Sequence, residues 1–325
     1  MKLQEIDKNG TLQGFVLVKS CERKTSKNGS TYLDLIICDG ESDTSAKVWS
    51  YTGSLNDIPQ PNSIILIRGT LGSYNGQAQF KIDRFRASTP QDNVDISSFV
   101  PSAGFPEEKM YNALVETIGT FSDSELASLA STILDEYKDV VMTLPAAYRL
   151  HHAIRGGLLL HTLSICRLCE AVASLYPSVD RDLLLCGAIL HDIAKSSEFN
   201  ISELGLVDSY TVKGTLIGHL VGGAIIVEET GKKLGISDEK LMLVEHMLIS
   251  HHGEPEFGAA VRPLFLEAEI LSSLDMLDAN IYEIENVIKV AAKGTFTSKI
   301  WALNDRKFLN HGRKEVSTDV TPFNN

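Results

Sequence analysis

The sequence has few cysteines, and it lacks both a long apolar run and an apolar leader. Its five cysteines are an odd number spread over 325 residues, which does not fit a disulfide framework and favours reduced thiols. No apolar run reaches the roughly 20 residues of a membrane-spanning helix. The opening MKLQEIDKNG has no apolar signal-peptide segment. We therefore expect a cytoplasmic protein that makes no membrane contact.

Several motifs of common enzyme classes are also missing. The chain has no Walker A phosphate loop, no G-x-G-x-x-G dinucleotide fingerprint and no G-x-S-x-G nucleophile elbow. Cys166 and Cys169 form one isolated C-x-x-C within a helical pattern, and we interpret them as small buried side chains rather than a redox or zinc motif. The chemistry must come from other residues.

The charge is distributed unevenly along the chain. The net charge is -12, yet residues 1–90 carry 11 Lys and Arg against 9 Asp and Glu, whereas residues 91–325 carry 19 against 33. An acidic chain as a whole repels polyanions. Contact with nucleic acid is therefore expected on the front segment, or through bound metal ions.

The first ninety residues predict five β-strands. Stretches rich in Val, Ile, Leu, Tyr and Thr alternate with turn residues, including hairpin turns at 27–29 and 75–76. The strands are expected at 14–25, 31–39, 44–51, 63–71 and 77–85, with a short helical link near Leu55. This order, and the segment from Val16 to Ser50 in particular, resembles the OB-fold barrels of nucleic-acid-binding anticodon-type domains.

The OB-fold resemblance implies a surface that binds single strands. In such barrels bases stack on aromatic side chains while basic residues follow the backbone. The candidate contacts are Lys24, Lys27, Tyr32, Lys47, Trp49, Arg68, Tyr74 and Phe80. For Trp49 and Phe80 a place in the barrel core is an equally good interpretation.

Beyond the strands the sequence predicts a linker and then helices. Residues 88–106 contain three of the ten prolines and few helix formers, which is typical of an interdomain linker. Apolar residues then recur at helical spacing in 110–121, 123–137, 157–175, 181–195, 215–234, 238–249 and 263–290. We expect an OB domain at 1–88, a linker and leading helices at 89–145, an all-α domain at 146–295 and a tail at 296–325.

A series of histidines and aspartates lies on these predicted helices. It comprises His161, His191, Asp192, His219, His251, His252 and Asp275. Imidazole and carboxylate groups are natural ligands of divalent metals, and a helical bundle can direct them into a common pocket. Polar groups on otherwise apolar helices are costly to bury, and metal binding offsets that cost. The sequence therefore predicts a metal site in the helical domain.

The sequence motifs around these residues resemble those of the HD-domain phosphohydrolase superfamily. The motifs are GGLLLHTL, LHDIAK, SHHGEPEFG and LSSLDMLDA. The resemblance implies one metal ion held by His161, His191, Asp192 and Asp275. It implies a second ion at His219, His251 and His252, with Asp192 as the bridge. A supporting or substrate-contacting role is the alternative for His219 and His252. Manganese is the first choice, with iron, cobalt and zinc as alternatives.

Further polar residues flank the series. Lys195 follows Asp192 by three residues, on the same helical face, and could hold a phosphate oxygen or simply end a helix. Arg155 is a second candidate phosphate contact. We place Asp192, Lys195 and Arg155 in the catalytic machinery, and we expect Asp278 to support a ligand. His246 is interpreted as structural, and His151 and His152 receive no role.

An OB domain joined to an HD domain with the entry word HHAIRGGLLLHT resembles the YhaM-type 3′-to-5′ exoribonucleases over nearly the whole chain. The resemblance implies a metal-dependent exonuclease that hydrolyses single-stranded RNA, with single-stranded DNA as a second substrate, to nucleoside 5′-monophosphates. It also suggests a homo-oligomer, to which the basic tail from Thr295 to Lys314 could contribute.

Two alternatives stay open from the residues. One is an HD phosphohydrolase of small or cyclic nucleotides, although Phe257-Gly258-Ala259 replaces the Gly-Tyr-Pro word of the cyclic-dinucleotide enzymes. The other is a non-catalytic protein that binds single-stranded nucleic acid.

Overall fold

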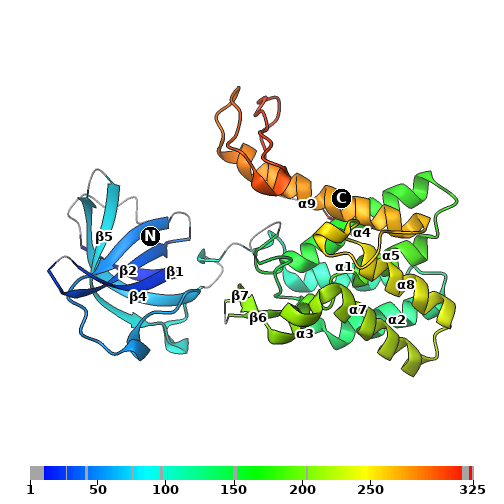
Figure 1. The fold of residues 1–325 in the computed structure, drawn as a ribbon, viewed down its shortest axis with the longest axis horizontal. Helices are drawn as coiled ribbons and strands as arrows, with labels where there is room; N and C mark the ends of the chain where they lie inside the picture. The colour runs from blue at the N-terminus through cyan, green and yellow to red at the C-terminus, as the bar shows by residue number, and fades with distance from the viewer. Residues whose placement is uncertain are drawn as a thin grey trace. The chain divides into compact units, whose positions relative to one another are not determined.

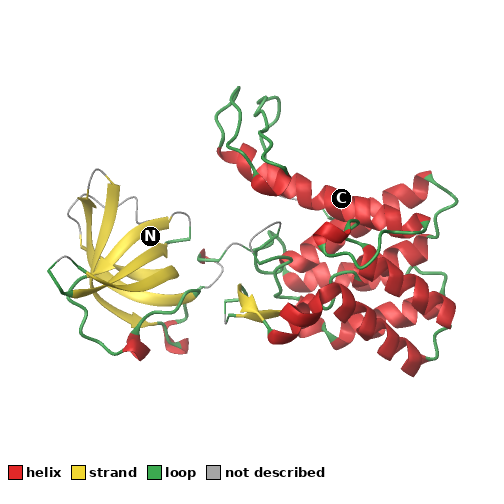
Figure 2. Ribbon diagram, viewed as in Figure 1, coloured by secondary structure: helices red, strands yellow, loops and turns green. Residues whose placement is uncertain are grey.

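The structure is a computed structural model that describes residues 11–26, 28–40, 43–74, 77–95, 98–100, 102–148, 152–202, 204–316 and 322–323. The chain divides into two compact units. One comprises residues 1–102 with 201–208, and the other comprises 103–200 with 209–325. Figure 2 shows that the long strands gather in the first unit and the long helices in the second.

The first unit is a closed five-stranded barrel (Figure 1). Its strands are β1 (Thr11–Thr25), β2 (Thr31–Cys38), β3 (Asp43–Val48), β4 (Ser63–Tyr74) and β5 (Gln77–Ala87). They pair in the order β1-β2-β3-β5-β4, in which β3 and β5 are parallel. A 3-10 turn at Leu55–Asp57, capped by Ser54, is the expected link between the third and fourth strands. The predicted OB barrel is confirmed.

The barrel unit extends past the predicted boundary at residue 88. Val94, Phe99 and Val100 pack against Leu17 and Ile64 in a small apolar cluster. These apolar residues attach most of the proline-containing segment to the barrel, so the division falls after Ser102. The segment 201–208, which includes Leu204 of the same cluster, also belongs to this unit, which the sequence did not predict.

The second unit is a helical bundle (Figure 1). Its helices are α1 (Glu107–Ile118), α2 (Ser124–Glu136), α3 (Lys138–Val141), α4 (Gly157–Leu175), α5 (Arg181–Leu190), α6 (Lys195–Glu198), α7 (Val212–Leu234), α8 (Asp238–Ser250) and α9 (Leu266–Val290). The short strands β6 (Phe199–Ile201) and β7 (Val207–Tyr210) interrupt the expected all-α pattern.

Two of the predicted helices differ from the expectation in an informative way. The helix expected at 181–195 ends at Leu190, and turns with Ile193 N–H donating to Leu190 and Lys195 N–H donating to Asp192 follow it. The helix expected at 215–234 begins at Val212 and is broken at Gly218. Both irregularities lie beside predicted metal ligands.

Helix α4 forms the centre of the helical unit. It packs against α1, α5 and α9, and a continuous run from Gly157 to Cys166 is buried. By length and composition it could cross a membrane, which the sequence analysis did not anticipate, but 56% of its most apolar stretch is buried inside the unit. A helix that is apolar on all sides is also what the core of a large domain requires.

Candidate functional site

The predicted metal ligands come from five different parts of the helical unit. His161 lies on α4, His219 on α7 and Asp275 on α9, while the His191-Asp192 pair follows α5 and the His251-His252 pair follows α8. Helices α4, α5, α8 and α9 pack on one another, and this packing brings ligands that are far apart in the sequence into one cluster.

Asp192 lies at the centre of this cluster. Its Oδ2 atom is 3.3 Å from His191 Nε2 and 4.0 Å from His161 Nε2. Its Oδ1 atom is 3.3 Å from His219 Nε2 and 3.7 Å from His251 Nε2. The two oxygens of one carboxylate therefore face two separate pairs of histidines, which is the arrangement expected of a bridging ligand.

Two more predicted ligands complete the cluster. Asp275 forms a group with His191 and His251 in which the ligand atoms lie within 4.8 Å of one another. His252 forms a second such group with His219 and His251. All seven residues that the sequence assigned to the metal site are thus brought together.

Three of the histidine rings are held at Nδ1 by backbone carbonyl oxygens. Their Nδ1 atoms lie 2.7–2.8 Å from the oxygens, in the pairs His191 with Ala188, His251 with Leu248 and His252 with Phe257. A carbonyl oxygen can only accept, so Nδ1 carries the hydrogen and Nε2 keeps its lone pair. This is the tautomer that binds a metal through Nε2.

The other two rings are held by carboxylates. His161 Nδ1 lies 2.7 Å from Asp278 Oδ2, as the sequence led us to expect. His219 Nδ1 lies 2.9 Å from Glu198 Oε2, and the His219 N–H donates to Glu198 Oε1 at 3.2 Å. Such outer carboxylates orient a ligand ring and raise its basicity. The sequence analysis did not find Glu198.

A glycine explains how His219 reaches this position. Gly218 breaks α7 with φ 73° and ψ 166°, a conformation that only glycine adopts at little cost. One turn earlier, Gly214 lies so close to the Glu198 backbone that an added Cβ would overlap it. The break and the close approach together place His219 beside Glu198 on one side and Asp192 on the other.

Burial keeps three of the histidines neutral. Removal from solvent lowers the pKa of His219 and of His251, and it lowers the pKa of His252 to about 4. Burial disfavours the charged imidazolium form. These rings are therefore in the form that ligates a metal at neutral pH.

His161 and Asp192 of the cluster carry charge. Burial alone would lower the pKa of His161, but hydrogen bonds with Asp275 and Asp278 outweigh it and raise that pKa to about 9. Burial likewise opposes ionisation of Asp192, yet the charge of Lys195 holds the pKa of Asp192 well below the usual range. Because a cation would compete with the proton on His161, metal binding there releases a proton.

The cluster passes a simple test of fit for divalent ions. His191 Nε2, His219 Nε2, His251 Nε2 and Asp192 Oδ1 are buried and have no hydrogen-bond partner within the described residues. Leaving a buried polar group unsatisfied costs about 1–3 kcal/mol. A divalent cation with mixed nitrogen and oxygen ligands satisfies these atoms together, so the residues present fit such an ion.

The two predicted basic catalytic residues occupy different surroundings. Lys195 is buried, and its Nζ donates to Asp192 Oδ2 at 2.6 Å, so it belongs to the cluster. Arg155 donates from Nε to Glu107 Oε1 at 3.1 Å, and no described contact joins it to the metal ligands. The role of Arg155 at substrate phosphate stays a prediction.

The histidines left without a ligand role have structural partners. His152 is fully buried at φ 50° and stacks on Tyr282 at 4.1 Å, with Nδ1 3.8 Å from Asp278 Oδ2. It therefore packs behind the His161 support. His246 Nε2 accepts from the Leu264 N–H, in agreement with a structural role. His151 lies outside the described residues.

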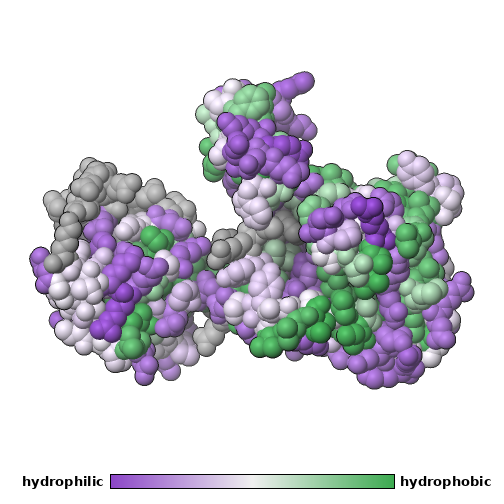
Figure 3. Space-filling view, in the orientation of Figure 1, coloured by the Kyte–Doolittle hydropathy of each residue, from purple (hydrophilic) through white to green (hydrophobic). Residues whose placement is uncertain are grey.

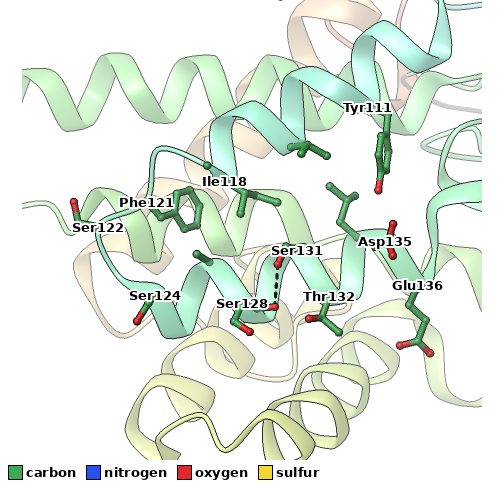
Figure 4. A pocket seen from close by; sticks show the side chains of 14 residues that line it. Tyr111, Ile118, Phe121, Ser122, Ser124, Ser128, Ser131, Thr132, Asp135 and Glu136 are labelled. Carbon is green, nitrogen blue, oxygen red and sulfur yellow. Dashed lines mark hydrogen bonds between the residues drawn. The ribbon is translucent and has the colours of Figure 1, made fainter.

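A hollow of about 920 Å³ lies elsewhere in the helical unit, between α1 and α2 (Figure 4). Hydroxyl side chains such as Ser128 and Thr132 line it beside Ile118 and Phe121, with Asp135 at one end. None of the predicted metal ligands lines it. The size of a hollow therefore does not locate the chemistry in this unit.

On the barrel, an aromatic pair forms a platform between β2 and the end of β3. The rings of Tyr32 and Trp49 stack at 4.9 Å, and Trp49 is 43% exposed. Lys47 Nζ lies 4.8 Å from the Tyr32 ring centre and 5.6 Å from that of Trp49. An exposed aromatic pair with an ammonium beside it suits the stacking of bases.

The other residues predicted to contact nucleic acid differ in their surroundings. Lys24 and Lys47 both pair with Asp34, at 2.8 and 3.1 Å, which offsets part of their charge. Arg68 is exposed. Lys27 and the side chain of Tyr74 lie outside the described residues.

The prediction for Phe80 is wrong. Its side chain is completely buried in the barrel core and cannot stack on a base. The alternation of Phe80 and Ile82 with Lys81 and Asp83 along β5 is the signal that could have shown this, because successive side chains in a strand point to opposite faces.

Comparison with known proteins agrees with this geometry. The HD domain family model matches residues 158–280. A protein of Listeria welshimeri named 3′-5′ exoribonuclease YhaM is 36% identical over 313 residues, which cover 95% of this chain and 98% of that protein. The Bacillus subtilis protein of the same name is 33% identical over 298 residues, covering 90% and 93%. The chain belongs to the YhaM 3′-5′ exoribonuclease family.

The alignment with the YhaM relatives extends over both units. The HD domain implies a divalent metal ion, and the residues of the cluster fit such an ion. Among solved structures, the second OB-fold domain of replication protein A from Methanococcus maripaludis aligns with 27% of this chain and 92% of its own, at 13% identity and a TM-score of 0.23. A replication protein A heterotrimer bound to single-stranded DNA aligns with 26% and 62%, at 17% identity and a TM-score of 0.22.

Proposed function

We propose that this chain is a metal-dependent 3′-to-5′ exoribonuclease that hydrolyses single-stranded RNA to nucleoside 5′-monophosphates, with single-stranded DNA as a second substrate. The observation that carries the proposal is the Asp192 carboxylate, whose two oxygens face separate histidine pairs. The names of the relatives supply the polarity and the substrate class.

The ligands divide into two sets around Asp192. His161, His191 and Asp275 with Asp192 would hold one ion, and His219, His251 and His252 with the same carboxylate would hold the other. Bound together, the ions supply a Lewis acid for the phosphoryl oxygen and lower the pKa of the attacking water. Manganese is our first candidate because carboxylate and imidazole ligands both suit it.

The protein's own residues position the reacting groups. Lys195 Nζ, 2.6 Å from Asp192 Oδ2, fixes the bridging carboxylate and brings positive charge to the place where phosphate oxygens arrive. Asp278 and Glu198 hold the rings of His161 and His219. On the barrel, the Tyr32 and Trp49 platform stacks bases and so holds the strand.

We also propose a cytoplasmic location and assembly into a homo-oligomer. The five cysteines are all free, which suits a reducing compartment. Apolar side chains are exposed along α7, and Figure 3 shows apolar surface gathered on the visible face of this unit. The exposed side chains on α7 are Val212, Leu216, Ile217, Val221 and Ile225. A second copy of the chain could cover them.

The test uses full-length protein, stripped of metal and resupplied with Mn²⁺, on 5′-labelled single-stranded RNA. A ladder descending from the 3′ end with release of mononucleotides, absent in Asp192→Asn, is the expected result. Intact RNA with every divalent metal would overturn the proposal. Cleavage of cyclic dinucleotides by the same preparation would then favour the small-nucleotide hydrolase.

A further inference from the structure

A row of polar side chains crosses the barrel on strands β1, β4 and β5, away from the aromatic platform on β2 and β3. Gln13 on β1 pairs with Arg68 on β4, and Arg68 pairs with Arg84 on β5. All three side chains are exposed. The two arginines are thus direct cross-strand neighbours on the outer surface.

Neither arginine is neutralised within the described part of the chain. Arg68 and Arg84 have no carboxylate within ion-pair distance there, whereas the neighbouring Arg86 is held by both oxygens of Asp92 at 2.7 Å. Like charges directly opposite one another in an antiparallel pair destabilise a sheet. Such a pair is expected where an anion bridges the two guanidinium groups.

The row borders a groove of about 290 Å³. Besides the three polar residues of the row, Leu66, Ile67, Phe85 and Arg86 line it. Leu66 stands two residues before Arg68 and so on the same face of the strand, whereas Phe85 packs against the barrel core. The groove therefore combines apolar surface at Leu66 with two guanidinium groups that have no carboxylate partner among the described residues, and a positively charged groove suits the backbone of a single strand.

The platform at β2 and the end of β3 differs from this groove. There Lys24 and Lys47 share Asp34, so much of their positive charge is already balanced. The platform offers rings for bases, and the groove offers unbalanced charge for phosphates. The chain separates the two kinds of contact onto different strands of one barrel.

We propose that the groove between Arg68 and Arg84 is a second contact for single-stranded nucleic acid, in which the two guanidinium groups bind backbone phosphate and an adjacent nucleotide lies over Leu66. This inference rests on the proposed function, since it concerns how the same substrate is held. It adds Arg84, Leu66 and Gln13 to the substrate-binding surface and gives Arg68 a defined partner.

The test compares two double variants of the full chain that lose the same charge. Arg68→Gln with Arg84→Gln removes the groove's charge. Lys19→Gln with Arg23→Gln removes two exposed cations of β1 and serves as the control. Binding of fluorescein-labelled single-stranded RNA to metal-stripped protein is measured by anisotropy across a salt series.

The groove variant should bind at least about tenfold more weakly, and its plot of log affinity against log salt should flatten by about 1.4, since each phosphate contact on a single strand contributes about 0.7. Arg68→Lys with Arg84→Lys should keep the slope and lose part of the affinity, because lysine cannot pair in a bidentate manner. The control should lose less affinity than the groove variant. Release of mononucleotide from a dinucleotide by the control variant should equal that of the wild type.

A groove variant with the affinity and slope of the control overturns the inference while leaving the exoribonuclease intact. Wild-type protein that neither binds nor shortens RNA overturns the proposed function instead. A groove variant whose barrel has unfolded, seen as a changed tryptophan emission spectrum, is replaced by the single Arg84→Gln variant, for which a flattening of about 0.7 is expected.

Discussion

The two units differ in where their polar side chains lie. In the helical unit, imidazole and carboxylate atoms are buried, oriented by partners behind them and left unsatisfied toward one another. In the barrel, the polar groups of the binding faces lie at the surface, where they are paired or open to solvent. The first arrangement is preorganised for divalent cations, and the second suits a long flexible anion. Loss of one group should therefore be severe in the helical unit and graded in the barrel.

The largest effect is expected at Asp192. Asp192→Asn keeps the size of the side chain but removes the charge that both histidine pairs face, so exonuclease activity should fall at least about 10³-fold, equivalent to about 4 kcal/mol. Initial rates on labelled RNA measure this. Asp83→Asn, an exposed carboxylate of the barrel, should retain full activity, and equal losses in the two variants would contradict the assignment.

The next largest effect distinguishes the buried Phe80 from the exposed Trp49 within the barrel. Phe80→Ala should destabilise the chain by about 3–5 kcal/mol because it empties a filled core position. Trp49→Ala should leave stability nearly unchanged and weaken RNA binding by about 1–3 kcal/mol through a lost stacking partner. Denaturant unfolding and anisotropy read out the two quantities. Equal stability losses would show that Trp49 belongs to the core.

A smaller effect on metal affinity is expected from the carboxylates that hold the histidine rings. Glu198→Gln should weaken metal binding about 10- to 100-fold because the ring of His219 loses its oriented acceptor, and Asp278→Asn should do the same through His161. Competition with a fluorescent chelator gives the affinity, independently of catalysis. Glu229→Gln, an exposed residue of α7, is the control. Unchanged affinity in Glu198→Gln would remove its positioning role.

The smallest effect concerns the thiols. Burial raises the pKa of Cys169 and Cys186 to about 12, and that of Cys166 well above its usual value, whereas the pKa of Cys21 on the barrel rises to about 11. Since a raised pKa keeps the thiol protonated, thiolate appears only as the pH rises. At pH 8 the native chain should label with iodoacetamide at Cys21 before Cys166, Cys169 and Cys186, as read by peptide mass spectrometry. Rapid labelling of Cys166 and Cys169 would revive a redox role.

The sequence was sufficient to find the seven residues that gather around Asp192 and to predict the barrel, but it did not reveal how the histidine rings are held. These residues lie in recognisable motifs, either within helices or directly after them, so the local pattern identifies them. The contact between Glu198 and His219, and the break at Gly218, require α6 to pack against the start of α7. The spacing of residues in the sequence does not predict this packing. Phe80 was misassigned although its strand alternates regularly, because its residue type was given more weight than its position.

The sequence likewise did not show which cations of the barrel form ion pairs. Residue type singled out Lys24, Lys47 and Arg68 alike, but only the strand register shows that Arg68 stands opposite Arg84 while both lysines share Asp34. Pairing of charges is a property of the folded barrel. Residue type therefore selects candidate contacts for nucleic acid, and the structure shows which of these cations have a carboxylate partner among the described residues.

The central claim is that Asp192 joins two metal sites, and electron paramagnetic resonance of the Mn²⁺-loaded chain tests it most directly. Two ions bridged by one carboxylate lie about 3.5–4 Å apart, so the account predicts a spin-coupled spectrum with two manganese ions per chain. An uncoupled spectrum of single ions in the saturated protein would contradict it.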